Sequence, residues 1–191
     1  RTVKYLSHFK FENIKEIYIQ SNGLNSLDFL KYLKCKDLRL LWLYNNYIQE
    51  YKSILNYDFK NLERINLKFN KISNIDILSR ANFIDIRILL LYDNQISDIS
   101  VLSVVPFLNL TYLNLSYNEI SDITILTNIP FNNLVKLDLS GNLISNIDPL
   151  ARMPINNLRE FFIKNNIIED NMFNQNVFDE MKKKYKYISI N

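Results

Sequence analysis

One asparagine returns at a fixed interval of 24 residues along almost the whole chain. The members of this column are Asn22, Asn46, Asn70, Asn94, Asn118, Asn142 and Asn166. A constant interval of about 20 to 50 residues is typical of a solenoid, in which each coil is one structural unit stacked on the next. The period therefore predicts a stacked array and divides the chain into coils that can be compared position by position.

Every asparagine lies in the same frame of apolar residues. We number each coil so that the asparagine is position 9, and positions 1, 4, 6 and 11 are then apolar in all seven coils, as in Leu110, Leu113, Leu115 and Ile120. Positions 4 and 6 are two residues apart, so their side chains face the same side, which is the periodicity of a β-strand. The first half of each coil is therefore expected to be a short strand whose apolar side chains face a common core.

The second half of each coil has a different apolar spacing. After the asparagine the apolar residues are three apart, as in Ile96, Ile99 and Leu102, which predicts a turn or a short 3₁₀ segment that returns along the outside. Position 22 forms a further column of Phe59, Phe83, Phe107 and Phe131, with Cys35 and Ile155 at its ends. We expect these rings to stack inside the solenoid.

The seven copies of L-x-x-L-x-L-x-x-N-x-L resemble the leucine-rich repeat family. The resemblance implies an α/β solenoid, a horseshoe with a concave parallel β-sheet and short 3₁₀ or turn segments on the convex side. It also implies that the asparagines form a ladder between coils. A side-chain amide suits that role because it can satisfy a backbone donor and a backbone acceptor together.

We expect one domain over residues 1–191, with a partial repeat at 1–13, seven repeats of 24 at 14–168 and a C-terminal cap at 169–191. Only two glycines are present, and no stretch has the composition of a linker. The partial repeat carries the apolar residues of a second half-coil, namely Val3, Leu6, Phe9 and Phe11. An unprotected coil face would be adhesive, so further residues are expected upstream.

The pattern breaks after Ile168, where a capping helix is predicted. Asp170 and Asn171 can cap it, and late lysines at 182–184 suit the helix dipole. One face would carry Phe173, Val177, Phe178, Met181 and Tyr185. Tyr185, Ile188 and Ile190 then repeat positions 1, 4 and 6, so a last strand is expected.

This ending is similar to the caps of intracellular leucine-rich repeat proteins, such as phosphatase-regulating, spliceosomal and dynein-light-chain members. Residues 182–184 are read as a solvated helix end, and a basic docking spot is the alternative.

Residues that point away from the core on the strands, at positions 3, 5, 7 and 8, are the candidate binding residues. They are unusually aromatic and apolar in coils two to five, and aromatic residues beside arginine are typical of protein interface hot spots. The candidates are Tyr18, Leu40, Trp42, Tyr44, Arg64, Lys68, Phe69, Ile88, Leu90, Tyr92, Tyr112 and Tyr117. Two alternatives stay open: the rings shield the sheet without a partner, or a partner binds the convex side. Recurring polar residues there are read first as turn formers, and they are Ser97, Asp98, Ser121, Asp122, Ser145 and Asn146.

No residue pattern for catalysis, a metal or a cofactor is found. His8 is the only histidine and Cys35 the only cysteine, so no His/Cys metal cluster or internal disulfide can form, and no glycine-rich phosphate loop is present. The net charge of +3 is too small to indicate nucleic acid, and no apolar run is long enough for membrane insertion. A lone cysteine favours a reducing, intracellular location in the cytoplasm or nucleus.

We therefore expect a non-enzymatic, monomeric scaffold that binds another protein through its concave face, as a regulatory or assembly subunit. The alternative is a secreted or surface microbial adhesion or effector domain, because segments such as Ile96-Ser97-Asp98-Ile99 are similar to internalin repeats. A third interpretation is a purely structural spacer, in which the aromatic residues of the concave face could be changed without loss of a partner.

Overall fold

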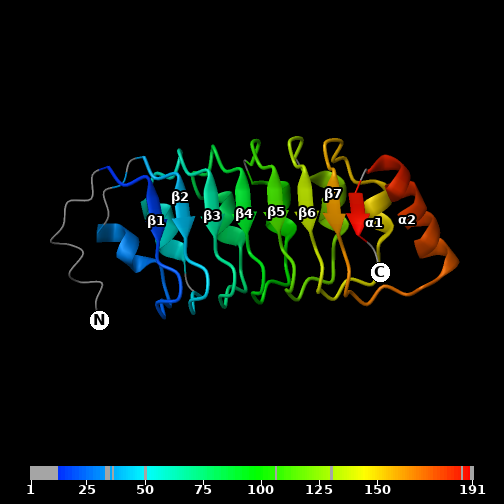
Figure 1. Ribbon diagram of the computed structural model, residues 1–191, viewed down its shortest axis with the longest axis horizontal. Helices are drawn as coiled ribbons and strands as arrows, with labels where there is room; N and C mark the ends of the chain where they lie inside the picture. Colours follow the sequence, from blue (N-terminus) through cyan, green and yellow to red (C-terminus); the bar gives the residue numbers. More distant parts are fainter. Residues whose placement is uncertain are drawn as a thin grey trace.

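Each coil supplies one three-residue strand, and the strands form a single parallel sheet in sequence order (Figure 1). The computed structural model describes residues 13–185 and 187–189, except positions 33, 34, 36, 50, 106 and 130. The strands are β1 (Glu16–Tyr18), β2 (Leu40–Trp42), β3 (Arg64–Asn66), β4 (Ile88–Leu90), β5 (Tyr112–Asn114), β6 (Lys136–Asp138), β7 (Glu160–Phe162) and β8 (Tyr187–Ser189). The predicted strand half of each coil is confirmed.

The register of the sheet follows the sequence period. From β1 to β7 each strand residue pairs with the residue 24 positions later, as Ile65 pairs with Leu89. The last pairing is wider, because Phe161 pairs with Ile188. The predicted closing strand is therefore present as β8, although Ile190, His8 and the expected partial repeat at 1–13 fall almost wholly outside the described residues.

Short 3₁₀ turns lie behind the sheet and return the chain to the next strand (Figure 1). They are η2 (Asp28–Tyr32), η3 (Lys52–Asn56), η4 (Asp76–Ser79), η5 (Ser100–Ser103) and η6 (Thr124–Asn128), and in the sixth coil the short helix α1 (Asp148–Ala151) takes this place. Near the start of η2, η4, η5, η6 and α1, a polar side chain accepts from the backbone N–H two residues ahead; Asp98 Oδ1, for example, accepts from Ser100 N at 2.8 Å. The polar residues of the convex side thus include formers of these turns.

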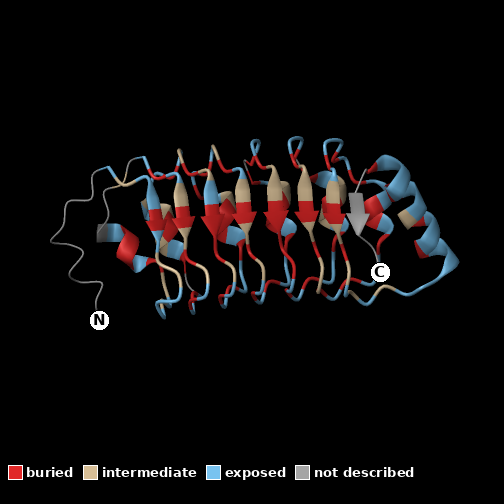
Figure 2. Cartoon of the chain, viewed as in Figure 1, coloured by how far each residue is buried: buried red, intermediate tan, exposed pale blue. Residues whose placement is uncertain are grey.

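The core consists of columns in which one coil packs on the next. In Figure 2 the middle residue of each strand from β1 to β7 is buried, whereas its neighbours are mostly half-buried or exposed. The phenylalanine column is a stack of rings with centroids 6.0 Å apart between Phe59 and Phe83, 6.2 Å between Phe83 and Phe107, and 6.3 Å between Phe107 and Phe131. Cys35, at the start of this column, is only half-buried.

The asparagine column is a ladder of hydrogen bonds between neighbouring coils. Asn118 Nδ2 donates to the carbonyls of Leu91 and Leu115, both at 3.0 Å, and Asn118 Oδ1 accepts from Ile96 N at 3.0 Å. The same pattern recurs from Asn46 to Asn166. Asn22 differs, because it is exposed and its side chain donates to the Gln20 carbonyl of its own coil.

The C-terminal end is covered by helix α2 (Met172–Lys184), which packs against α1 (Figure 1). Asn171 caps it by accepting from Asn174 N at 2.9 Å. Val177, Met181 and Tyr185 are buried as predicted, but the prediction for Phe173 is wrong, because its side chain is 57% exposed. The first turn of the helix buries Asn174 instead, whose Nδ2 donates to the Glu169 carbonyl at 2.8 Å.

Candidate functional site

We define the sheet face as the side chains at positions 3, 5, 7 and 8, which lie opposite the core on β1 to β7 and the residues just after them. Parallel strands are about 4.8 Å apart, so equal positions in neighbouring coils form close-packed rows. None of the twelve predicted binding residues is buried: Tyr18, Arg64, Phe69 and Tyr117 are exposed and the other eight are half-buried. The sheet thus brings them together on one surface.

Three outward positions are buried, which sequence analysis missed. Asn66 and Asn114, both at position 5, are each 5% exposed, and Ser116 is 2% exposed. These three residues therefore point away from the core and are still packed against their neighbours on the sheet face. Each is small or polar in a row of larger residues, and that contrast along the row is the signal that could have identified them.

A first aromatic cluster lies on coils one and two. Trp42 contacts Tyr18 and Tyr44 edge-on, with ring centroids 5.6 and 6.2 Å apart. The Tyr18 hydroxyl donates to Glu16 at 2.8 Å, and this hydrogen bond raises the pKa of Tyr18. We call Tyr18, Trp42 and Tyr44 the first ring cluster.

A second aromatic cluster crosses coils three to five. Tyr92 contacts Phe69 and Tyr117 edge-on, with centroids 4.8 and 5.1 Å apart. Lys68 Nζ lies 5.9 Å from the centroid of the Tyr92 ring, within the range of a cation–π contact. Partial burial raises the pKa of Tyr92, so this phenol stays protonated at neutral pH. We call Phe69, Tyr92 and Tyr117 the second ring cluster.

Position 8 has a left-handed backbone in every coil. Its φ values lie between 53° and 65° from Ser21 to Asn165. Glycine, asparagine and aspartate tolerate this conformation, whereas a bulky side chain there is an outlier that costs about 1–2 kcal/mol. Phe69 and Tyr117 nevertheless occupy it, and their side chains are 44% and 47% exposed. Two rings are therefore displayed on a backbone that disfavours them.

The Tyr117 ring extends over the next coil, where Gly141 makes room for it. A Cβ atom at Gly141 would lie 2.9 Å from the Tyr117 ring, which is closer than carbon atoms pack. Gly141 also has a φ of 65°. The lone glycine of this row therefore sets where the second ring cluster ends.

Coils six and seven present a polar, internally paired surface. Lys136 Nζ lies 2.7 Å from Glu160 and about equally far, 5.1 and 5.0 Å, from the ring centroids of Tyr112 and Phe162. The hydrogen bond with Glu160 raises the pKa of Lys136. The charge of this lysine is already matched within the chain.

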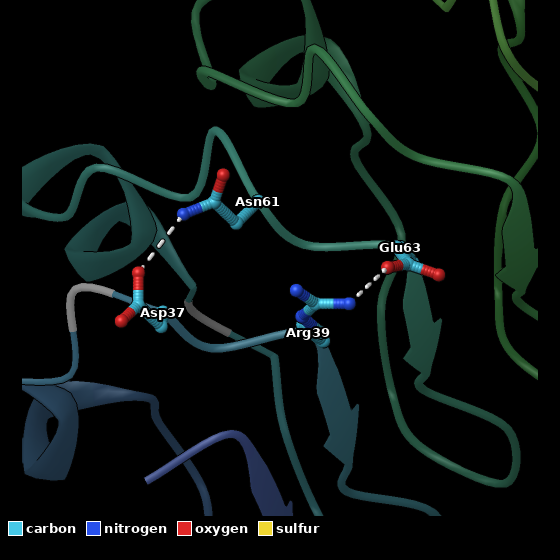
Figure 3. Close-up of polar contacts among 4 residues, drawn as sticks. All are labelled: Asp37, Arg39, Asn61 and Glu63. Atoms are coloured by element: carbon cyan, nitrogen blue, oxygen red, sulfur yellow. Dashed lines mark hydrogen bonds and ion pairs between the residues drawn. The ribbon is translucent and has the colours of Figure 1, made fainter. Parts of the chain in front are cut away.

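The edge where the strands begin carries pairs of polar residues 24 positions apart. Figure 3 shows Arg39 facing Glu63 and Asn61 facing Asp37. Arg39 Nη1 lies 3.4 Å from Glu63 Oε1, and Asn61 Nδ2 lies 3.3 Å from Asp37 Oδ1. The side chains of Arg39 and Glu63 are 60% and 32% exposed, so their ion pair contributes little stability. These pairs link neighbouring coils and do not converge on a common point.

The described residues contain no group of three or more His, Cys, Asp or Glu side chains that could hold a metal ion. His8 lies outside those residues. Burial raises the pKa of the Cys35 thiol, which disfavours the reactive thiolate. Among the described helices, none is long and apolar enough to cross a membrane.

Comparison with known proteins identifies the repeat. A family model described as leucine-rich repeats, two copies, matches residues 108–152. Over these residues the chain matches the leucine-rich repeat family. No curated protein matches it in sequence.

Solved leucine-rich repeat structures share this fold. Internalin InlF of Listeria monocytogenes is 21% identical with a TM-score of 0.65, and the match covers 100% of this chain and 58% of InlF. Internalin C2 of the same species is 22% identical with a TM-score of 0.61, covering 100% of this chain and 84% of the internalin. A leucine-rich repeat protein of Leptospira interrogans is 21% identical with a TM-score of 0.68, covering 93% of this chain and 48% of that protein. At these identities the similarity concerns the fold alone, and the chain spans less than two thirds of InlF and of the Leptospira protein.

Proposed function

We propose that this leucine-rich repeat chain is a scaffold that binds a globular protein through the sheet face of coils one to five. Leucine-rich repeats commonly mediate protein–protein interaction, so the class of function follows from the fold. The choice of surface rests on the ring clusters, which gather partly exposed aromatic side chains at the centre of the array. Interface hot spots have this composition.

One observation supports the choice of the sheet face as the binding surface. Phe69 and Tyr117 occupy left-handed positions at which Asn45 and Asn165 stand in other coils. Edge-on ring contacts with Tyr92 are worth about 0.5–1.5 kcal/mol each, which is comparable with the conformational cost. The rings therefore add little net stability, and residues that are strained without stabilising the fold are typical of functional surfaces.

This balance gives a first prediction. Replacing both residues in the variant Phe69→Asn/Tyr117→Asn should change the free energy of unfolding by less than about 1 kcal/mol, because strain relief offsets the lost ring contacts. It should also abolish retention of the partner when the chain is used for affinity capture from a lysate of the source organism. Urea unfolding and mass spectrometry of the captured proteins measure the two effects.

The matched control changes two exposed apolar residues in the turns that precede β4 and β5. Ile84 and Leu108 are 54% and 62% exposed. The variant Ile84→Asn/Leu108→Asn should retain the same proteins as wild type. Equal capture by all three forms would show that the rings only shield the sheet, as in a structural spacer.

The proposal includes a regulatory or assembly role inside the cell, supported by the lone, partly buried Cys35 and the helix-and-strand cap. A second candidate is a secreted or surface microbial domain, favoured by the Ser-Asp-Ile segments and the shared fold with internalins. Fractionation of the source cells distinguishes the two, because the first requires the protein in the cytoplasm or nucleus and the second requires it outside.

A further inference from the structure

The third coil contributes Phe69 to the second ring cluster and is otherwise the most basic part of the sheet face. Its outward residues at positions 3, 5 and 7 are Arg64, Asn66 and Lys68. In register, Trp42 and Leu90 lie on either side of Asn66. With strands about 4.8 Å apart, these two large side chains are rooted about 10 Å from each other, and we call the polar position of Asn66 between them the slot.

Asn66 is buried but incompletely hydrogen-bonded. It is 5% exposed, and its Oδ1 accepts from Lys68 N at 3.1 Å. Over the described residues, Asn66 Nδ2 donates to no protein acceptor within hydrogen-bonding distance. This nitrogen is not among the described side-chain atoms that are both buried and unsatisfied, so it reaches solvent, and its two N–H groups are open to an acceptor from outside the chain.

Asn114, two coils later at the same position, shows what Asn66 lacks. Asn114 Oδ1 also accepts from the backbone two residues ahead, at Ser116 N. Its Nδ2 donates to Tyr112 Oη at 2.9 Å and lies 3.5 Å from Asp138 Oδ2. Around Asn66, Arg64 stands where Asn114 has Tyr112, and Leu90 stands where Asn114 has Asp138. Neither of these two side chains can accept a hydrogen bond.

The cations beside Asn66 are also without an acid at salt-bridge distance within the described part of the chain. Lys136 shows the contrast, with its Nζ 2.7 Å from Glu160. Arg64 is exposed, and Lys68 Nζ lies against the Tyr92 ring. The acidic residues of the sheet face that are nearest to these two cations in the coil order are Glu16 and Asp93. Glu16 accepts a hydrogen bond from the Tyr18 hydroxyl, and Asp93 is exposed.

We propose that the third coil is the receptor for one acidic side chain of the protein partner. The carboxylate of an aspartate or glutamate would accept from Asn66 Nδ2 and lie between the cations of Arg64 and Lys68. Apolar residues on either side of that acid would pack on the two ring clusters. This assignment rests on the proposed function and adds the chemistry by which the partner is recognised.

A protein carboxylate fits these features better than a nucleic-acid phosphate. Binding to a phosphate backbone needs a series of cations along the surface, whereas this face offers two and then continues as aromatic and apolar residues. The slot is bordered by Trp42 and Leu90, which suit the apolar neighbours of a single acidic residue in a folded or helical partner.

The test uses selection from a random 12-residue peptide library displayed on phage, with the full chain as bait. We expect enrichment of peptides in which an aspartate or glutamate is flanked by apolar or aromatic residues. The variant Asn66→Asp should bind such a peptide at least about tenfold more weakly, because it places a carboxylate opposite the ligand's carboxylate. Asp138 shows that a coil accepts aspartate here, with Oδ1 accepting from Ser140 N at 3.0 Å.

Two controls make the result specific. Ser121→Asp adds the same charge on the exposed convex side and should bind as wild type does. Changing the acid of the selected peptide to its amide should weaken binding to wild type by a similar factor and leave binding to Asn66→Asp almost unchanged. Such non-additivity identifies a direct pair.

The outcomes separate the two proposals. Selected peptides that lack an acid, or that bind Asn66→Asp as tightly as wild type, overturn the carboxylate receptor and leave the scaffold function standing. Peptides whose binding survives Phe69→Asn/Tyr117→Asn overturn the sheet face itself. Tighter binding of an oligodeoxythymidine than of any selected peptide, lost in Asn66→Asp, would assign the slot to phosphate and overturn the assignment to a protein acid.

Discussion

The asparagine at position 9 joins its own coil to the coil before it with both its donor and its acceptor. Asn118 is 7% exposed and donates to one carbonyl of its own coil and one of the coil before. Its Oδ1 also satisfies a buried backbone N–H of that earlier coil. Because a buried polar group without a partner costs about 1–3 kcal/mol, the amide acts mainly by keeping the turn's backbone satisfied.

We predict that Asn118→Ala lowers the free energy of unfolding by about 3 kcal/mol, since two carbonyls and one N–H lose this partner. Asn22→Ala is the matched control, because Asn22 is exposed and its side chain binds only within its own coil. That change should cost less than about 0.5 kcal/mol. Urea unfolding followed by circular dichroism gives both values, and equal losses would contradict the ladder as the cause.

At this scale the sequence predicts inward residues well and outward residues poorly. Columns such as the asparagines are visible because the same residue recurs in coil after coil. Asn66, by contrast, is buried because of what stands beside it in the row, with Trp42 and Leu90 in neighbouring strands. The period alone does not indicate the shape of those neighbours, so neither the slot nor its unused donors could be predicted.

Among the elements, the strands and 3₁₀ turns were predictable and the orientation of the cap helix only partly so. Apolar residues two apart predict the strand of each coil, and apolar residues three apart predict its 3₁₀ turn. Asn171 marks the start of α2. The spacing also favoured Phe173 over Asn174 for the buried face. Asn174 is buried because its amide reaches the Glu169 carbonyl, a polar contact that a hydrophobic pattern does not reveal.

The cap helix provides a direct comparison of two apolar residues. Met181 is 1% exposed and Phe173 is 57% exposed. We predict that Met181→Ala costs about 2–5 kcal/mol of unfolding free energy, because it leaves a cavity between α2 and the last coils. Phe173→Ala should cost no more than about 0.5 kcal/mol. Thermal unfolding of the two variants measures both losses of stability. A larger loss for Phe173→Ala than for Met181→Ala would refute the orientation of α2.

For the whole molecule, the repeating register means that stability depends on contacts between adjacent coils. Removing one full period should therefore leave every column continuous. We predict that deletion of 95–118 preserves one cooperative urea transition, with the slope reduced by about one eighth, as 24 of 191 residues are lost. Deletion of 95–106, half a period, should abolish the transition because it breaks the columns, and a cooperative transition there would contradict the stacked register.

The class of function could be predicted from the sequence, whereas the identity of the partner could not. A sheet face rich in rings is visible in the sequence once the coils are aligned. The two ring clusters and the basic third coil depend on contacts across strands, such as that of Tyr92 with Phe69 and Tyr117. Such contacts are set by the register of the sheet and by side-chain direction.

Site-specific photo-crosslinking tests most directly whether the sheet face holds the partner. A benzophenone amino acid is placed at Tyr92, in the second ring cluster, or at Leu108, which is 62% exposed in the turn before β5, and each form is irradiated in a lysate of the source organism. The account predicts that one protein is crosslinked from position 92 and not from position 108. Crosslinking of that protein from position 108 alone, or equally from both positions, would contradict it.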